Sequence, residues 1–331
     1  MKLSDLSEAQ LVSHFRESFP RGERTIIGIG DDCAQIGAPE GSFIVTTDVM
    51  VEDQHFHLSW STGYEVGARV AAQNLADIDA MGGRPSGLVA SVVAPRDMDA
   101  EVFLDVVRGL GERAREVGAG VVGGDLSAGE KLVISITAFG YCPGPIVRRD
   151  GAQPGDVIAV SGTLGFSYAG LDLLEGGHVD PSARGPEELG DLAPFVDTYR
   201  APHPPLGSGV AAAAAGATAM MDLSDGPAAD ARRMAQASGL VIEFDRAALE
   251  AEARLLQVPA QVCQADPVRW VLQGGEEHGM LAAFPHDTVL PEGFRVVGHT
   301  RVCRNGETPA AMLDGEVLRG AWDHFDPESV H

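Results

Sequence analysis

The chain has 331 residues, of which 48 are acidic and 24 basic, and its formal net charge is −24. Single hydrophobic cores stop growing at roughly 250 to 300 residues, so this length predicts two domains. A composition of 44% hydrophobic and 22% charged residues excludes an intrinsically disordered chain. The negative charge argues against nucleic acid as a partner, because an acidic surface repels phosphate backbones.

The first domain is expected to mix helices and strands. Ser7 and Gln10 have the spacing of a capping box and predict a helix that runs to Phe19. Short apolar runs predict strands, and apolar residues at helical spacing predict helices. The expected strands cover residues 25–29, 42–46, 86–94 and 132–141, and the expected helices cover residues 65–81 and 99–117.

A segment rich in proline, glycine and charge, residues 142–156, marks the domain boundary. We expect residues 1–145 to form the first domain and residues 146–331 the second. The expected strands of the second domain cover residues 157–161, 217–221 and 240–244, its helices residues 207–215 and 228–238, its main loop residues 176–191 and a rigid turn residues 202–205.

No membrane segment is expected, because the longest apolar run, residues 210–221, is shorter than the roughly 18 to 20 residues that a spanning helix needs. The first residues lack the apolar core of a signal peptide. The cysteines form neither a C-x-x-C pair nor a disulfide framework. These features predict a cytoplasmic protein.

The common lysine-based phosphate sites are absent from the sequence. The only lysines, Lys2 and Lys131, lie outside any G-x-x-x-x-G-K-[ST] loop. Asp31 and Asp32 follow Gly28-Ile-Gly30 and break the dinucleotide pattern G-x-G-x-x-G. A nucleotide site in this acidic chain would therefore need divalent cations between carboxylates and phosphate oxygens.

Aspartates recur at the ends of apolar runs or beside glycines, and one lies on an expected helix. Each alone is more often a turn former or a helix cap than a metal ligand. Together they suit a site for several Mg²⁺ ions, because Mg²⁺ prefers hard oxygen ligands shared between carboxylates and substrate phosphates. These aspartates are Asp31, Asp32, Asp48, Asp77, Asp125, Asp222 and Asp225.

Eight motifs follow one another along nearly the whole chain. They are GIGDDCA (28–34), TTDVMVEDQHF (46–56), NLADIDAMG (74–82), VGGD (122–125), PGD (154–156), MDLSDG (221–226), GGEE (274–277) and WDHF (322–325). In this order they resemble the motifs of the thiamine-monophosphate kinase family, which shares its fold with aminoimidazole-ribonucleotide synthetase.

The resemblance implies an α/β (α+β) protein of two domains with the PurM-like architecture, whose N-terminal domains pair into a shared β-barrel in a homodimer. Residues 1–145 would bind ATP and metal and dimerise, and residues 146–331 would complete the active site. The implied reaction is Mg²⁺-dependent transfer of the γ-phosphoryl group of ATP to thiamine monophosphate. It would proceed by direct in-line displacement without an acid or base residue, as the last step of thiamine diphosphate biosynthesis.

The resemblance also implies roles for residues at matching positions. Those implied to hold Mg²⁺ are Asp32, Thr46, Thr47, Asp48, Asp77, Asp125, Asp222 and Asp225. Those implied to contact ATP are Gly124, Asp125, Arg149 and Ser224. Those implied to contact thiamine monophosphate are His55, Glu276 and Trp322, where a carboxylate and an aromatic ring suit a cationic, aromatic ligand.

Two loops depart from the family pattern. Leu126-Ser-Ala128 replaces the usual Thr-Thr-Arg after Gly-Gly-Asp, so the phosphate contacts of that loop are expected to differ. The usual Gly-Gly-Glu-Asp-Tyr-Glu appears as Gly-Gly-Glu-Glu-His278-Gly279, and a change in substrate preference is expected there.

Other interpretations stay open for single residues and for the whole chain. Cys33 is expected to be structural, because neighbouring carboxylates disfavour a thiolate. His55 and His57 have no third ligand at zinc spacing, and Trp322 suits a core as well as a ligand contact. The same fold serves ATP-dependent synthetases, and the altered loops raise the alternative of a non-catalytic nucleotide-binding or thiamine-phosphate-binding protein. The retained carboxylates favour the kinase.

Overall fold

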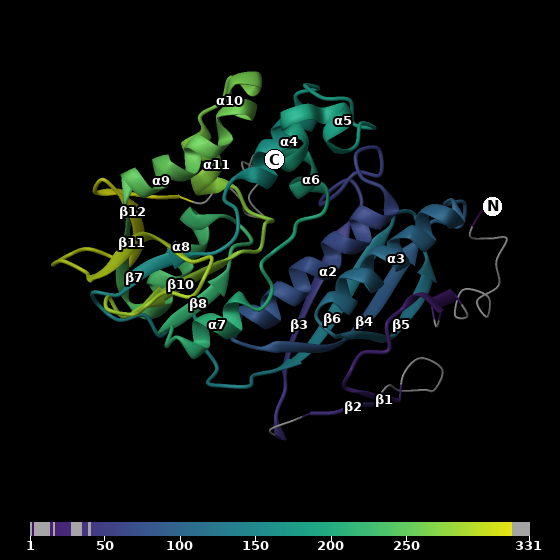
Figure 1. Cartoon of the computed structure of the whole chain (residues 1–331), viewed down its shortest axis with the longest axis horizontal. Coiled ribbons are helices and arrows are strands. Elements are labelled where there is room, and N and C mark those ends of the chain that lie inside the picture. Colours follow the sequence, from purple (N-terminus) through teal and green to yellow (C-terminus); the bar gives the residue numbers. More distant parts are fainter. Residues whose placement is uncertain (1, 3–13, 16, 28–34, 39–40, 320–331) are drawn as a thin grey trace. The chain divides into compact units, whose positions relative to one another are not determined.

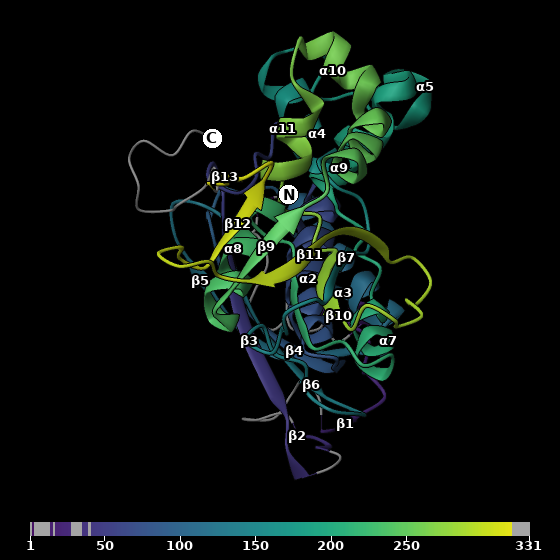
Figure 2. The ribbon, with the colours of Figure 1, turned by 90° about the vertical axis from the view of Figure 1, so that its left-hand side faces the viewer.

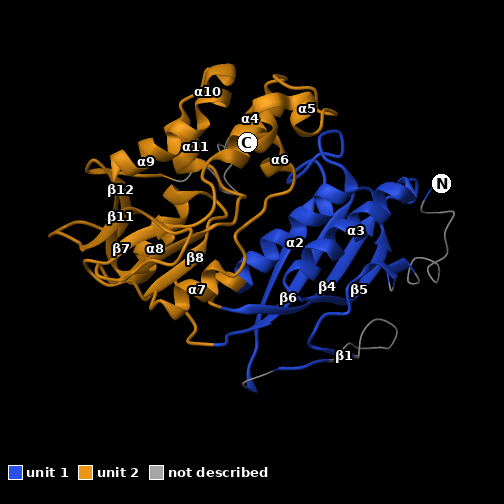
Figure 3. Cartoon of the chain, in the orientation of Figure 1, with its two compact units in different colours: residues 1–78, 83–143 blue, residues 79–82, 144–331 orange. Residues whose placement is uncertain are grey.

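The computed structural model describes residues 2, 14–15, 17–27, 35–38 and 41–319 (Figure 1). The chain divides into two compact units, residues 1–78 with 83–143 and residues 79–82 with 144–331 (Figure 3). Most of the helix expected between Ser7 and Phe19 lies outside the described residues. The roles assigned to the two domains stay predictions.

The first unit contains a four-stranded sheet in the order β3-β6-β4-β5 and a separate pair of short strands, β1 and β2. β6 pairs antiparallel with β3 and β4, whereas β5 runs parallel to β4. The helices α2 and α3 lie along one face of the sheet (Figure 1). The elements are β1 (Thr25–Ile27), β2 (Gln35–Ile36), β3 (Ile44–Val51), α2 (Gly63–Ala80), β4 (Arg84–Ala94), α3 (Ala100–Glu116), β5 (Gly120–Ala128) and β6 (Val133–Tyr141).

Helices α2 and α3 approach so closely that glycine is required where they meet. A Cβ at Gly67 would lie 2.0 Å from the Val106 carbonyl oxygen, and one at Gly109 would lie 2.0 Å from the Tyr64 carbonyl oxygen. The α3 helix begins at the N-cap Asp99, whose side chain accepts a hydrogen bond from an amide of the first turn. These contacts hold the two helices as one layer of the unit.

The faces of the four-stranded sheet differ because successive residues of a strand point to opposite sides. On β6, Ile134 and Ile136 are fully buried. On the other side, Phe43, Val45 and Val49 are 60%, 55% and 47% exposed. We call this side of the sheet the open face; it exposes the apolar side chains of Phe43, Val45 and Val49.

Two strands of this sheet correct the predictions. β3 continues to Val51 instead of ending near residue 46, and β5 (Gly120–Ala128) was not predicted. Asp48 and Asp125 therefore lie within strands, not in loops at strand ends. Aspartate and glycine are depleted in strands, so the sequence signal was weak, while pairing with β6 and β4 outweighs that preference. The strands expected over 86–94 and 132–141 and the helices expected over 65–81 and 99–117 are confirmed.

The second unit contains a seven-stranded sheet in the order β13-β12-β9-β11-β7-β10-β8, in which only β12 and β9 are parallel. Figure 2 shows β12, β9 and β11 edge to edge. The strands are β7 (Val157–Val160), β8 (Ala219–Asp222), β9 (Leu240–Phe244), β10 (Met280–Phe284), β11 (Arg295–Val302), β12 (Ala310–Leu313) and β13 (Glu316–Val317). The predicted strands 157–161, 217–221 and 240–244 are confirmed.

The second unit also contains helices, of which α8 packs against β8, β9 and β12. They are α4 (Phe166–Glu175), α5 (Gly185–Leu189), α6 (Ala193–Arg200), α7 (Ser208–Ala214), α8 (Pro227–Ser238), α9 (Arg246–Ala253), α10 (Gln257–Cys263) and α11 (Pro267–Gln273). The prediction of a loop over residues 176–191 is wrong in part, because this segment contains the short helix α5. Pro186 and two acidic residues in its first turn favour a helix start there.

One expected motif has a structural role in this unit. Asp156 of the PGD motif is buried, and its carboxylate accepts hydrogen bonds from the Thr218 hydroxyl at 2.6 Å and from the Gln153 amide at 2.8 Å. The motif therefore fastens the turn before β7. Among the described residues, no helix has the length and apolarity that crossing a membrane requires.

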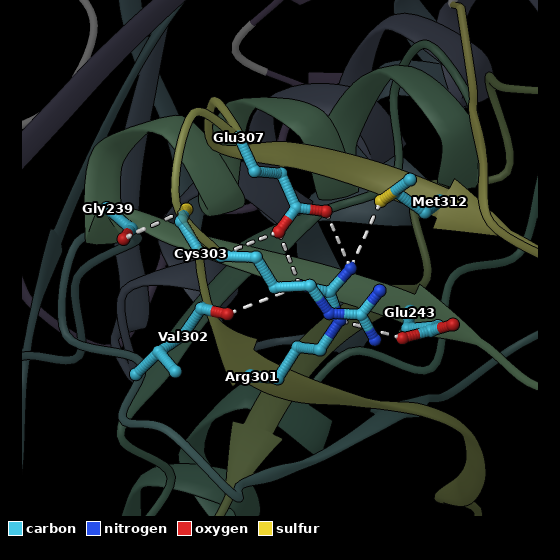
Figure 4. Close-up of polar contacts among 8 residues, drawn as sticks. Gly239, Glu243, Arg301, Val302, Cys303, Glu307 and Met312 are labelled. Atoms are coloured by element: carbon cyan, nitrogen blue, oxygen red, sulfur yellow. Dashed lines mark hydrogen bonds and ion pairs between the residues drawn. The ribbon is translucent and has the colours of Figure 1, made fainter.

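Arg301 of β11 joins the sheet to the loop that precedes β12 (Figure 4). Its guanidinium lies 2.9 Å from the Glu243 carboxylate of β9 and donates to the Glu307 carboxylate at 2.7 and 2.8 Å. The amide of Arg304 also donates to Glu307, at 2.8 Å. Hydrogen bonds from Arg301 and then from the Arg304 amide lower the pKa of Glu307 to about 2.

We expect Glu307→Gln to destabilise the chain at neutral pH. In the folded chain the pKa of Glu307 is about 2 against an ordinary 4.5. The ionised carboxylate therefore stabilises the fold above about pH 4.5, and this contribution is lost as the pH falls toward about 2. Urea unfolding should give a lower midpoint for the variant at pH 7 and a smaller difference from the wild type at pH 3.

The matched control is Glu316→Gln, since Glu316 is exposed on β13. A Glu307→Gln midpoint that equals the wild type at pH 7, or a difference that grows on acidification, would contradict the assigned role of the ion pair.

Candidate active site

In the first unit, β3 and the last turns of α2 bring together a hydroxyl and carboxylates. The Thr46 hydroxyl donates to Asp77 Oδ2 at 2.6 Å. Asp48 lies two residues after Thr46 and therefore on the same side of β3, and all three residues are half-buried. We call Thr46, Asp48 and Asp77 the first-unit cluster. The structure thus places three of the expected metal ligands on the helix-covered side of the sheet.

Thr47, another expected ligand, lies on the open face. Its hydroxyl donates to the Ile136 carbonyl oxygen at 2.9 Å and accepts from the Thr137 hydroxyl at 3.2 Å. The alternation of side chains along β3 separates it from Thr46 and Asp48. The structure does not bring Thr47 into the first-unit cluster.

Asp125 also lies on the open face. It pairs with Ser91 of β4, which pairs with Ser135 of β6, which in turn pairs with Val49 of β3. Residues directly opposite each other in a sheet point to the same side, and Asp125 is exposed. A chain segment or ligand on the open face would therefore meet Asp125 and not Asp48.

Gly124, expected to contact ATP, is required by the packing of the sheet. A Cβ at this position would lie 1.9 Å from the Ala90 carbonyl oxygen of β4. A side chain would therefore separate β5 from β4. The glycine brings the β5 backbone close to its neighbour and leaves Asp125 at the surface.

His55 lies in the loop after β3, where its ring is oriented by the backbone. The Val51 amide donates to His55 Nδ1 at 3.0 Å, so the neutral ring carries its proton on Nε2. Nearby, Asp53 lies 3.1 Å from the Lys131 ammonium and 3.3 Å from His57 Nδ1. Lys131 first and His57 second keep the pKa of Asp53 below its usual value, although burial opposes this. The two histidines thus bond to different partners within the chain.

In the second unit, two loops meet beyond the end of β8. The Glu276 amide donates to the Ser224 carbonyl oxygen at 2.9 Å, and a Cβ at Gly275 would lie 2.0 Å from that same oxygen. Glu276 and His278 have φ values of 68° and 55°, which residues other than glycine rarely adopt. Such backbone conformations persist where the surroundings enforce them, often at functional sites.

The carboxylate of Asp222, the last residue of β8, contacts His278. The Nδ1 of His278 lies 3.1 Å from Asp222 Oδ2, and the residues are 5% and 8% exposed. The sequence drew attention to His278 only as a difference from the family pattern. Its contact with an expected metal ligand is a finding of the tertiary structure.

Asp225, the next expected ligand, forms an ion pair with Arg233 of α8. Arg233 also lies 2.7 Å from Asp230 Oδ1, and Asp230 Oδ2 accepts from the Asp225 amide at 3.1 Å. Burial, then the charges of Asp225 and Asp222, raise the pKa of the fully buried Asp230 to about 7. The sequence interpretation missed Asp230 and Arg233. Their spacing of three residues just after the DLSDG segment was the available signal.

Two further motif acids cap helices by accepting from backbone amides at their N-termini. Glu277 accepts from the Ser167 amide at 2.8 Å in the first turn of α4. Burial raises the pKa of Glu277 to about 7, and the hydrogen bond from Ser167 opposes this shift. Asp79 accepts from the Gly207 and Gly209 amides at 2.9 and 3.0 Å at the start of α7. These acids bind backbone within the second unit.

The remaining expected residues are less constrained or lie outside the described part. Arg149 is exposed, and its carbonyl oxygen accepts from the Ser238 hydroxyl at 3.2 Å. Ser224 and Glu276 are half-buried in the second unit. Asp32 and Trp322, like Cys33, lie outside the described residues.

The donors of both units suit a hard cation. Within residues 14–15, 17–27, 35–38 and 41–319, no group of three or more His, Cys, Asp or Glu side chains is arranged to hold a metal ion by itself. Mg²⁺, however, usually takes one or two carboxylates and completes its shell with water and substrate phosphates. In the first unit, the hydroxyl and carboxylate oxygens of Thr46, Asp48 and Asp77 are ligands of the kind that Mg²⁺ prefers. In the second unit, the carboxylate of Asp222 is a ligand of the same kind.

The chain is similar to AIR synthase related proteins and to solved thiamine-monophosphate kinases. Residues 30–142 match the family model of AIR synthase related protein, N-terminal domain. The crystal structure of thiamine-monophosphate kinase from Stenotrophomonas maltophilia K279a aligns with a TM-score of 0.79 at 25% identity, over 95% of this chain and 98% of that chain. The structure of AaThiL complexed with AMPPCP and TMP aligns with a TM-score of 0.73 at 28% identity, over 98% of this chain and 99% of that chain.

A sequence relative then defines the family. The chain is 39% identical over 327 residues to the thiamine-monophosphate kinase of Mycobacterium tuberculosis, which covers 98% of this chain and 93% of the relative. The chain belongs to the thiamine-monophosphate kinase family. The resemblance found in the sequence and the α/β, PurM-like architecture with two sheets are confirmed.

Proposed function

We propose that this protein transfers the γ-phosphoryl group of ATP to thiamine monophosphate and produces thiamine diphosphate and ADP, the last step of thiamine diphosphate biosynthesis. The observation that carries the proposal is the 39% identity to a thiamine-monophosphate kinase along 98% of the chain. The relative solved with AMPPCP and TMP supports it. TMP corresponds to the proposed acceptor, and AMPPCP is a nucleotide with a triphosphate-like chain.

The residues for which we propose contacts with Mg²⁺ are Asp32, Thr46, Thr47, Asp48, Asp77, Asp125, Asp222 and Asp225. When bound, Mg²⁺ neutralises the charge that develops on the transferred phosphoryl group. The hydrogen bond from Thr46 orients Asp77, and Arg233 forms an ion pair with Asp225. Thr47 and Asp125, on the open face, would act on a different part of the ligand from the first-unit cluster.

The proposed contacts with ATP come from Gly124, Asp125, Arg149 and Ser224, and those with thiamine monophosphate from His55, Glu276 and Trp322. Arg149 is exposed and carries a guanidinium, which matches phosphate geometry. His55 presents an Nε2 proton, because its Nδ1 accepts from the Val51 amide, and it can donate to a phosphate oxygen. The carboxylate of Glu276 suits the cationic thiazolium ring of thiamine.

No general base is needed in this reaction. The attacking group is a phosphate oxygen that is already ionised at neutral pH, so positioning and charge neutralisation carry the transfer. We propose direct in-line displacement without a covalent enzyme intermediate. Carboxylates that hold cations and donors that meet phosphate oxygens are sufficient for that chemistry.

We also propose that the chain forms a homodimer through its open face, as the sequence resemblance implied. Phe43, Val45 and Val49 expose apolar side chains on a regular sheet. A second copy offers the same apolar surface, so a two-fold interface would remove both from water. This pairing would also place the Asp125 side of the sheet at or beside the interface.

The direct test of the reaction separates the products formed from Mg·ATP and thiamine monophosphate, with EDTA as the metal-free control. Metal-dependent thiamine diphosphate and an equal amount of ADP are expected. ADP without thiamine diphosphate would indicate another acceptor, and binding of both ligands without any product would indicate a binding protein.

Asp48→Ala and Asp222→Ala are each expected to lower kcat by about 100-fold, because each removes a proposed ligand of the cation that stabilises the transition state. Steady-state kinetics at several Mg²⁺ concentrations would measure the loss. Asp287→Ala, which changes an exposed aspartate of the second unit, is the matched control and should keep the wild-type rate. Near-normal turnover of either variant at ordinary Mg²⁺ would reject that residue as a metal ligand.

The double variant Val45→Lys/Val49→Lys is expected to be a monomer, because lysine charges on the open face would be buried without partners in the dimer. Light scattering coupled to size exclusion would measure the mass. Val289→Lys is the control, since Val289 is 88% exposed in the second unit. A wild type that is monomeric at micromolar concentration, or a double variant that stays dimeric, would contradict the proposed interface.

A further inference from the structure

His278 and Asp222 are both placed by the backbone of the second-unit sheet. Asp222 ends β8 and pairs with Met280 of β10, two residues after His278. The His278 amide donates to the Leu223 carbonyl oxygen at 3.1 Å, one residue after Asp222. The sheet and this hydrogen bond therefore set the distance between the two side chains, and His278 adopts a left-handed φ of 55° at this point.

The side-chain contact has a defined direction. An ionised carboxylate can only accept hydrogen bonds, so the imidazole donates through Nδ1–H to Asp222 Oδ2, 3.1 Å away. The side chains are only 6% and 11% exposed, which limits competition from water for this bond. One carboxylate oxygen is thereby engaged, and rotation of the carboxylate about its axis is restricted.

The two proposed metal ligands of this unit are held in different ways. Asp225 is paired with Arg233, a permanent cation, within a group that also includes the buried Asp230. Asp222 is held by an imidazole, which can donate one hydrogen bond while it is neutral. A neutral donor orients the carboxylate and leaves its negative charge available to a cation.

We propose that His278 is a positioning residue that orients the Asp222 carboxylate for Mg²⁺, an inference that rests on the proposed metal role of Asp222. Partners that hydrogen-bond to ligating carboxylates orient the ligand and tune the affinity for the metal. The departure of this chain from the family pattern at His278 then concerns the metal site, not the choice of substrate that the sequence suggested.

The test compares three substitutions of His278. His278→Leu removes the donor. His278→Asn keeps an N–H near the place of Nδ1, and asparagine tolerates a positive φ. His278→Gln carries its N–H farther from the backbone, nearer the place of Nε2. The leucine and glutamine variants should need about 10-fold more Mg²⁺ for half-maximal rate. The asparagine variant should need a Mg²⁺ concentration close to that of the wild type.

A second measurement does not depend on turnover. Binding of Mn²⁺ in the presence of AMPPCP, followed by the electron paramagnetic resonance signal of free Mn²⁺, should weaken in the same order. KM for thiamine monophosphate at saturating Mg²⁺ should stay unchanged in all three variants. Thermal unfolding identifies any variant that is not folded. If His278→Leu does not fold, the comparison of His278→Asn with His278→Gln tests the positioning role.

Equal Mn²⁺ binding by the wild type, His278→Asn and His278→Gln would overturn the proposal. An equal loss of Mn²⁺ affinity in His278→Asn and His278→Gln would also overturn it. A change confined to KM for thiamine monophosphate would assign His278 to the substrate and also overturn it. Asp222→Asn separates the two levels of inference. If that variant binds Mn²⁺ as the wild type does, the metal role of Asp222 fails, whereas a loss in Asp222→Asn with normal His278 variants rejects only the positioning role.

Discussion

A carboxylate that is wholly or partly buried is stable only if hydrogen bonds or a cation compensate for its lost hydration, and this requirement organises the acidic motifs of the chain. The Thr46 hydroxyl holds Asp77, and Arg233 holds Asp225 and Asp230. The N-termini of α7 and α4 hold other acids in the same way, through backbone amides. Acids of similar appearance in the sequence therefore divide into those bound to backbone and those held by side chains.

Asp77 and Asp79 illustrate this division. They lie two residues apart on α2, so they point to different sides of the helix. Asp77 meets the hydroxyl of β3, whereas Asp79 accepts amides at the start of α7 in the second unit. A single motif thus supplies a candidate metal ligand and a helix cap, and only the former is available for chemistry with phosphate.

The alternation of side chains along β3 has a comparable consequence for the first unit. Thr46 and Asp48 face the helices, whereas Val45, Thr47 and Val49 face the other way. One strand therefore contributes to the first-unit cluster and to an exposed apolar surface at the same time. Ligand binding and the proposed dimer contact would share this strand, so each constrains the residues that the other can use.

The sequence by itself determined the family, the α/β class, most of the regular elements of the first unit and the acid-rich motifs, because local periodicity and ordered motifs need no long-range information. It did not determine that Asp48 and Asp125 lie within strands, since the pairing that overrides their weak strand preference comes from distant segments. Nor could it show which donor meets which acid: His278 reaches Asp222 across 56 residues, and Asp79 reaches Gly207 across 128. Those partners are chosen by sheet register and helix packing, which exist only in the folded chain.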